Sequence, residues 1–155
     1  MSVLIEDLEN HSFYATSGSA GLDLRSTQEV ILEPFEKKLV STGVSIFKMD
    51  NHIQGFITAK SGLALKYGLV VFNSPAIIDS DYTREIKVML FNNSKEPYKV
   101  EKKSFIAQIT FVPFVRAQKV VIEFEGCQSL FHVASAVIEN KRVGGFGIDW
   151  TINII

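Results

Sequence analysis

Apolar and polar residues alternate in short runs along most of this chain, which is the pattern of half-buried β-strands. Residues 52–58 and 84–91 both show this alternation. Further strands are expected over residues 20–24, 29–33, 37–47, 67–72, 98–101, 105–115 and 119–124. Turn-forming residues separate these runs at roughly 8–12-residue intervals. Many short strands of this kind predict an all-β sandwich or barrel.

One short helix interrupts the β pattern. It is expected over residues 61–66, with Ser61 as its N-cap and Gly68 as the residue that ends it. Gly43, inside the long strand over residues 37–47, is a candidate β-bulge. Residues 1–18 are mixed, and residues 125–138 show no clear period.

The composition fits one ordinary domain, with 155 residues of which 46% are hydrophobic. The formal net charge is −1, and no basic run points to a nucleic-acid partner. The most apolar stretch, residues 105–115, is too short to span a bilayer, and the acidic N-terminus does not read as a signal peptide. The single cysteine, Cys127, leaves no intrachain disulfide and suits a reducing compartment. We therefore expect a soluble intracellular protein, cytoplasmic or nuclear, that binds neither nucleic acid nor membrane.

The segment over residues 73–91 combines a tight hairpin with a long strand. Asn73, Ser74 and Pro75 are turn formers. Two carboxylates, Asp79 and Asp81, and the phenol of Tyr82 then lie at the mouth of the hairpin. Such an acidic turn can hold a water or a metal-bound ligand. Taken alone, it is more typical of a solvated loop whose carboxylates cap its own backbone.

Four other short segments accompany this turn along the chain. In order, the set reads SAGLDL over 19–24, AKSGLA over 59–64, IDSDY before EIKVMLFN over 78–92, FIAQI over 105–109 and GGFG over 144–147. In order and spacing these segments resemble the five signature motifs of the trimeric deoxyuridine triphosphatases (dUTPases). The resemblance covers nearly the whole chain and is far more specific than a lone glycine motif.

The resemblance implies a fold and an assembly. The fold would be a distorted jelly-roll β-sandwich or barrel with one short helix. Residues 1–138 would form this β domain, and residues 139–155 an arm that closes over a neighbouring subunit's site. The assembly would be a homotrimer, with each site built from motifs one, two and four of one subunit, motif three of a neighbour and the arm of the third.

The resemblance also implies the reaction, a Mg²⁺-dependent hydrolysis of dUTP to dUMP and pyrophosphate by attack of water at the α-phosphorus. Asp79 would hold and orient the attacking water. Because the triphosphate is anionic, the water must be oriented and partly deprotonated by a fixed acceptor before it attacks phosphorus. Asp23 would bind Mg²⁺ through water, in keeping with the few carboxylates that Mg²⁺ uses beside substrate phosphates. Without the family pattern, Asp79 would be read as a turn cap and Asp23 as a strand-end carboxylate.

Further residues would bind the substrate. The ring of Tyr82 would lie under the deoxyribose and exclude a 2′-hydroxyl, and Phe146 of the arm would stack on the uracil. The hairpin would read the uracil edge through Asn73, Ala76, Ile77 and Ile78. The remaining substrate-binding positions are Lys60, Ser61, Gly62, Lys87, Gln108, Arg142 and Gly147. Ser61 can also be a plain N-cap, and Gln108 an interior amide that pairs across the sheet.

The chain departs from the family pattern mainly at phosphate-binding positions. Lys60 and Phe105 stand where the family usually has arginine, and Ala76 where it usually has glycine. Near the end, Lys141 takes an arginine position with Arg142 one residue out of register. Ile148 and Asp149 replace a Ser-Thr pair. Lysine keeps the charge but loses the planar fork of arginine. These changes predict weaker triphosphate binding or slower turnover.

Two other functions remain open at this point. A catalytically weak dUTPase-like binding or regulatory protein is favoured by the altered fifth motif and disfavoured by the intact Asp79 and Tyr82. A dCTP deaminase of the same fold would need a carboxylate base aimed at the pyrimidine ring, and no segment here supplies one.

Overall fold

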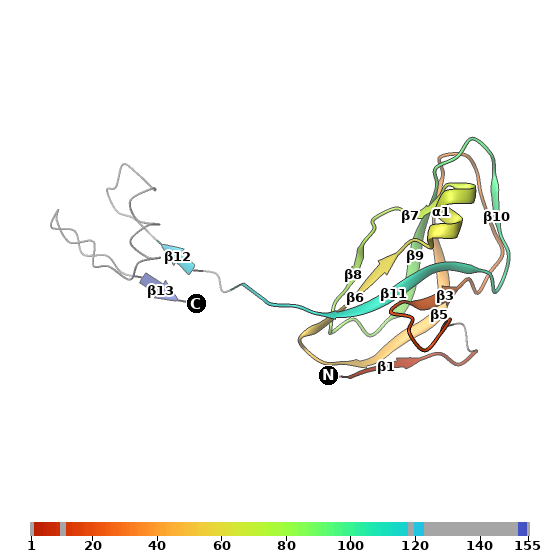
Figure 1. The fold of residues 1–155 in the computed structure, drawn as a ribbon. Coiled ribbons are helices and arrows are strands. Elements are labelled where there is room, and N and C mark those ends of the chain that lie inside the picture. Colours follow the sequence, from red (N-terminus) through yellow and green to blue (C-terminus); the bar gives the residue numbers. More distant parts are fainter. Residues whose placement is uncertain (1, 10–11, 118–119, 123–151, 155) are drawn as a thin grey trace, which may run out of the picture. The chain divides into compact units, whose positions relative to one another are not determined.

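The computed structural model describes residues 2–9, 12–117, 120–122 and 152–154, and it divides the chain into two units, Met1–Val115 and Arg116–Ile155. The regular secondary structure of the described residues consists of strands and one short helix, so the all-β prediction is confirmed (Figure 1). None of them forms a helix long and apolar enough to cross a membrane. The predicted boundary between residues 138 and 139 lies outside the described residues.

The described residues of the first unit form eleven strands and the helix α1 (Ser61–Tyr67). The strands are β1 (Val3–Glu6), β2 (Ser12–Tyr14), β3 (Leu22–Arg25), β4 (Val30–Leu32), β5 (Lys37–Met49), β6 (Ile53–Thr58), β7 (Leu69–Val71), β8 (Ala76–Ile78), β9 (Glu85–Asn92), β10 (Tyr98–Val100) and β11 (Phe105–Pro113). In the second unit, β12 (Val120–Ile122) pairs antiparallel with β13 (Ile152–Ile154).

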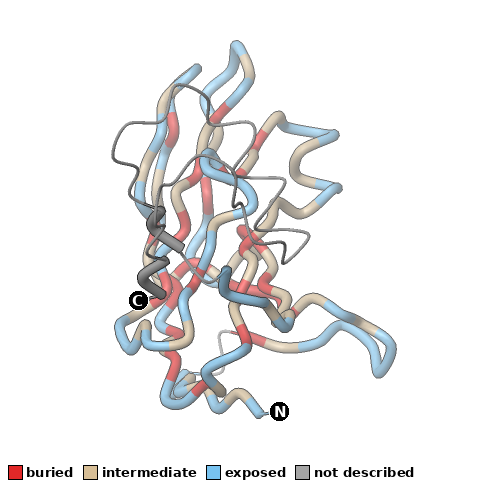
Figure 2. The backbone as a smooth tube through the Cα atoms, turned by 90° about the vertical axis from the view of Figure 1, so that its left-hand side faces the viewer, coloured by how far each residue is buried: buried red, intermediate tan, exposed pale blue. Residues whose placement is uncertain are grey.

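Two larger antiparallel sheets and a small one build the first unit. The five-stranded sheet has the order β2-β3-β11-β6-β8, the four-stranded sheet has the order β1-β5-β9-β7, and β10 pairs with β4. Buried aliphatic side chains from both larger sheets, such as Leu24, Ile109 and Val88, form one core. Figure 2 colours the buried positions of the backbone red. The alternation along β6 and β9 matches this burial, because every second residue points into the core.

Gly43 forms the bulge that the sequence predicts. Its φ is +69°, and the register between β5 and β9 shifts between Ser41 and Ser45. The Gly43 amide donates to the Glu85 carboxylate at 2.9 Å instead of to a backbone carbonyl. A positive φ favours glycine, so the bulge explains the residue.

The ends of α1 were predicted only in part. Gly68 ends the helix with a left-handed φ of +67°, and its amide donates to the Ala64 carbonyl. The N-cap, however, is Lys60 and not Ser61. Lys60 has extended backbone, and its carbonyl accepts from the amides of Leu63 and Ala64, so Ser61 is already the first helical residue.

Candidate functional site

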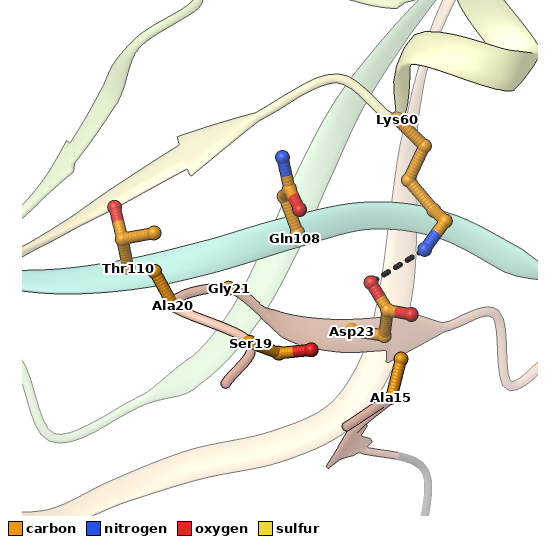
Figure 3. Close-up of a pocket in the computed structure, with 8 residues that line it drawn as sticks. All are labelled: Ala15, Ser19, Ala20, Gly21, Asp23, Lys60, Gln108 and Thr110. Carbon is orange, nitrogen blue, oxygen red and sulfur yellow. Dashed lines mark hydrogen bonds and ion pairs between the residues drawn. The ribbon is translucent and has the colours of Figure 1, made fainter. Parts of the chain in front are cut away.

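A pocket of about 360 Å³ opens on the five-stranded sheet. Figure 3 shows the residues that line it: Ala15, Ser19, Ala20, Gly21, Asp23, Lys60, Gln108 and Thr110. They come from β3, β11, the residue that caps α1 and the loop between β2 and β3. The pocket therefore brings together residues of motifs one, two and four, which are far apart in the sequence.

The strand register explains this gathering. Gln108 on β11 lies opposite Asp23 on β3 and opposite Thr58 on β6. Residues paired in this way point to the same face of a sheet. Lys60 follows two residues after Thr58 and leads into α1, which places its side chain over the same face.

Asp23 and Lys60 form an ion pair inside the pocket. The Lys60 Nζ lies 2.5 Å from the Asp23 Oδ1, and the side chain of Asp23 is only 8% exposed. Asp23 lies within β3 rather than at a strand end. A charge buried this far needs a partner, and Lys60 supplies it. The lysine that replaces the family's arginine is thus engaged with a carboxylate in the structure.

Gln108 makes one hydrogen bond across the sheet. Its Nε2 donates to the Thr58 hydroxyl at 3.3 Å. A Cβ placed on Gly21 would lie 2.6 Å from the Gln108 Oε1. The glycine of motif one therefore gives Gln108 the room to lie in the pocket. Thr58 was not singled out from the sequence, although the alternation along β6 places it on this face.

The hairpin of motif three lies at the edge of the same sheet. Its strand β8 pairs with β6 on one side and is the last strand of the described sheet. Asn73 precedes β8 and is exposed, and Ile77 on β8 is 59% exposed. The peptide bond between Ser74 and Pro75 is cis. One row of β8 backbone groups is therefore left without a strand partner within the described chain.

Asp79 follows directly after β8, in the turn to β9. Its carboxylate is exposed, and within the described residues it makes no hydrogen bond or ion pair. The same holds for Asp81, so the backbone capping that is typical of carboxylates in such a turn is not made by Asp81 among these residues. The turn is closed instead by the Tyr82 amide, which donates to the Asp79 carbonyl at 3.1 Å. Self-capping, the alternative explanation of Asp79, is thus not what the structure shows.

Tyr82 is half-buried against the core, and its hydroxyl donates to the Glu85 carbonyl at 2.9 Å. This bond fixes the orientation of the ring. A tyrosine that is merely packed usually leaves its hydroxyl at the surface. The Tyr82 hydroxyl is instead bonded to the backbone, which leaves the ring itself as the part that can contact a ligand.

Matches with known proteins decide the family. The family model for dUTPase matches residues 11–133, which is most of the chain. The chain belongs to the dUTPase family. The deoxyuridine 5'-triphosphate nucleotidohydrolase of Neisseria meningitidis serogroup A is 47% identical over 137 residues, covering 86% of this chain and 83% of that protein. That of Nautilia profundicola is 43% identical over 110 residues, covering 71% and 77%. The family and enzyme class predicted from the five motifs are confirmed.

Solved dUTPase structures share the fold. A mutant dUTPase from Staphylococcus aureus phage phi11 has a TM-score of 0.69 and 22% identity, and covers 83% of this chain and 100% of that one. The native EIAV dUTPase has a TM-score of 0.67 and 24% identity, and covers 76% and 93%. The predicted dUTPase-like jelly-roll is therefore confirmed.

The remaining substrate-binding residues predicted for this dUTPase are not gathered in the pocket. Ser61 and Gly62 are exposed at the start of α1, and a Cβ on Gly62 would meet nothing within 4 Å. Lys87 lies on β9 of the other sheet, where its Nζ is 3.8 Å from the Glu85 carboxylate. Arg142, Phe146 and Gly147 lie outside the described residues.

Within the described ranges, no three His, Cys, Asp or Glu side chains come together as an enclosed metal site would require. Among the same residues, Asp23 is the one carboxylate that lines the pocket. One carboxylate cannot enclose Mg²⁺ by itself. It fits the kind of Mg²⁺ site in which the ion keeps several waters and also binds substrate phosphates.

Proposed function

We propose that this dUTPase hydrolyses dUTP to dUMP and pyrophosphate by attack of a water, oriented by Asp79, on the α-phosphorus. The observation that carries this proposal is the exposed carboxylate of Asp79 at the end of β8, unpaired among the described residues, in a chain of this family. A carboxylate without such a partner is free to accept a proton from water. Tyr82, held by its bond to the Glu85 carbonyl, is proposed to lie under the deoxyribose.

Uracil recognition is proposed to rest on the free edge of β8 and on Asn73. Backbone amides and carbonyls on an edge strand can pair with a base in the way that another strand would pair. A hydrophobic pocket gains only about 1–3 kcal/mol from one methyl group, whereas groups built to pair with uracil can reject a mismatched base by about 10⁴-fold. A rigid backbone edge can also exclude the thymine methyl by direct clash.

Mg²⁺ is proposed as the cofactor, with Asp23 as its water-mediated carboxylate. When bound, the ion would neutralise charge on the phosphates. Lys60 would then exchange its contact with Asp23 for one with the substrate, and Gln108 would position a phosphate or a bound water. The phi11 dUTPase structure concerns the coordination of a structural Mg(II) ion in that protein.

A homotrimer with shared sites is proposed for two reasons. First, the pocket is lined by residues of motifs one, two and four and by none of residues 73–82, so one chain does not close the predicted site within its described residues. Second, large apolar side chains are exposed, including Phe47 at 73% and Leu39 at 57%. Such apolar surface is typical of a face that another chain covers. Residues 139–155 are proposed as the arm.

A catalytically weak dUTP-binding protein is the second candidate. Two observations favour it: Lys60 is bound to Asp23, and Phe105 carries no charge. Among the described residues that line the pocket, no other cation is therefore available to bind phosphate.

Pyrophosphate release tests both candidates. We expect release from dUTP with Mg²⁺, loss of release with EDTA, and little release from dTTP, dCTP or UTP. Release from dUTP alone supports the enzyme. Binding of dUTP without release would support the second candidate, and conversion of dCTP to a uracil nucleotide would contradict both.

Substitution of Gly21 with alanine should lower kcat/KM for dUTP by roughly 10- to 100-fold, because the new Cβ displaces the Gln108 side chain from the pocket. Steady-state kinetics measure this effect. Gly18→Ala is the matched control, since a Cβ there meets nothing within 4 Å. Equal rates for the two variants would show that Gln108 does not act in the pocket.

A further inference from the structure

An arginine that lies against two neighbouring phenylalanine rings is found beside the pocket. The guanidinium carbon of Arg25 is 5.0 Å from the ring centroid of Phe13 and 4.7 Å from that of Phe105. The two rings are themselves 5.1 Å apart at an angle of 55°. This arginine–aromatic cluster, Phe13, Arg25 and Phe105, holds a cation against two aromatic surfaces.

The cluster adjoins the Asp23–Lys60 pair. The Lys60 Nζ lies 5.0 Å from the same Phe105 centroid while it bonds Asp23. Arg25 is two residues after Asp23 on β3, so both point to one face of the sheet. Phe105 on β11 lies opposite Arg25, and Phe13 on β2 lies opposite Asp23. The cluster thus extends the face on which the pocket opens.

Arg25 lacks a polar partner among the described residues. Its Nε is buried without a hydrogen bond, and no ion pair or hydrogen bond of the guanidinium is formed in this part of the chain. Buried polar atoms are almost always hydrogen-bonded, so the unpaired Nε indicates an acceptor that the described part of the chain does not supply. Lys60 has such an acceptor in Asp23, whereas Arg25 has only rings.

We propose that Arg25 binds the triphosphate of the substrate, supplying the planar cation that the family usually carries at the position of Phe105. This inference rests on the proposed function for the identity of the substrate. Guanidinium groups bind phosphate through two parallel hydrogen bonds, which lysine cannot reproduce. Phe105, in place of contributing a charge, positions Arg25 and Lys60 with its ring. The loss of one arginine in motif four is thereby offset by another on the neighbouring strand.

Binding measurements separate this role from a packing role. Calorimetry would give Kd values of wild type, Arg25→Gln and Arg25→Lys for α,β-imido-dUTP, for dUMP and for inorganic tripolyphosphate. We expect Arg25→Gln to weaken binding of imido-dUTP and of tripolyphosphate by about 10- to 100-fold, the size of one charged hydrogen bond. Arg25→Lys should recover part of the loss, and dUMP, with one phosphate, should bind as it does to wild type.

A rescue and a charge control complete the test. Phe105→Arg in the Arg25→Gln background returns a cation to the motif-four position and should restore imido-dUTP binding. Lys95→Gln removes one charge from an exposed turn and should leave all three affinities unchanged. Unfolding midpoints of the variants confirm that each is folded at the temperature of the measurement.

The outcomes distinguish this inference from the proposed function. If wild type releases pyrophosphate from dUTP while Arg25→Gln binds imido-dUTP and tripolyphosphate as tightly as wild type, the inference on Arg25 is wrong and the function stands. An equal loss for dUMP and imido-dUTP would likewise overturn it and assign Arg25 to packing. If no dUTP is hydrolysed but tripolyphosphate binding depends on Arg25, the function is wrong and the anion site stands.

Discussion

Replacement of Asp79 with asparagine is expected to lower kcat for dUTP hydrolysis by about 10²–10⁴-fold, because the amide cannot accept the proton of the attacking water. The substitution keeps the shape of the side chain, and Asp79 makes no hydrogen bond among the described residues that the change would break. Binding of imido-dUTP should therefore change little. Stopped-flow or steady-state release of pyrophosphate measures the effect on kcat.

Asp81→Asn is the matched control, since Asp81 lies in the same turn, is also exposed and has no side-chain partner in the described part of the chain. Its kcat should stay near that of wild type. A fall as large as that of Asp79→Asn would contradict the assignment of the base to Asp79.

Asp79→Asn also tests whether sites are shared. Subunits carrying Asp79→Asn and subunits carrying Asp23→Asn, unfolded and refolded together, should regain activity that neither variant has alone. Some mixed sites would then combine an intact Asp23 with an intact Asp79. No gain over the separate variants would indicate sites contained within one subunit.

Replacement of Asn92 with alanine is expected to lower the free energy of unfolding by about 3–4 kcal/mol, since several hydrogen bonds of one buried side chain are lost at once. Asn92 is fully buried, and its Nδ2 donates to the carbonyls of Leu32, Glu33 and Glu96 at 3.0, 3.2 and 2.8 Å. Its Oδ1 accepts from the amide and hydroxyl of Ser94. Urea unfolding at a fixed protein concentration, followed by far-UV circular dichroism, gives the change in midpoint.

Asn93→Ala serves as the comparison for Asn92→Ala. Asn93 is the neighbouring residue of the same type, is exposed, and contacts Gly68 through its backbone. Its replacement should leave the midpoint almost unmoved. Similar shifts for both variants would show that the hydrogen bonds of Asn92 do not carry the stability assigned to them.

The strands that alternate over six or more residues were predictable, and β6, β9 and the long strand β5 lie close to where the sequence places them. The glycines at 43 and 68 were also predictable, because a positive φ leaves a clear preference for glycine. β1, β2 and β13 were not. Strands of three or four residues often carry too few positions for a period to show, although β4 and β10, which are equally short, were predicted; β1, β2 and β13 depend on the neighbour with which they pair.

The candidate site divides in the same way. Asp23, Lys60 and Gln108 were found because they lie in recognisable motifs, and the strand register then brings them together. The contact of Lys60 with Asp23, the orphaned Nε of Arg25 and the role of Asn92 were not predictable. The first two depend on side chains that are distant in the sequence. Asn92 resembles an ordinary turn former until its three backbone carbonyl partners are seen. The N-cap was predicted at Ser61, one residue after its actual position at Lys60, because lysine is not a residue that typically caps a helix.

The place of β11 between β3 and β6 has a consequence for synthesis on the ribosome. Residues 105–113, which form β11, are the last strand of the five-stranded sheet to be synthesised. β3 and β6 therefore leave the exit tunnel before β11, the strand that lies between them. Until then each exposes a strand edge that can pair with another chain. Nascent chains stalled before residue 105 should therefore lack the pocket and depend on chaperones, and the sheet would close only when β11 is released.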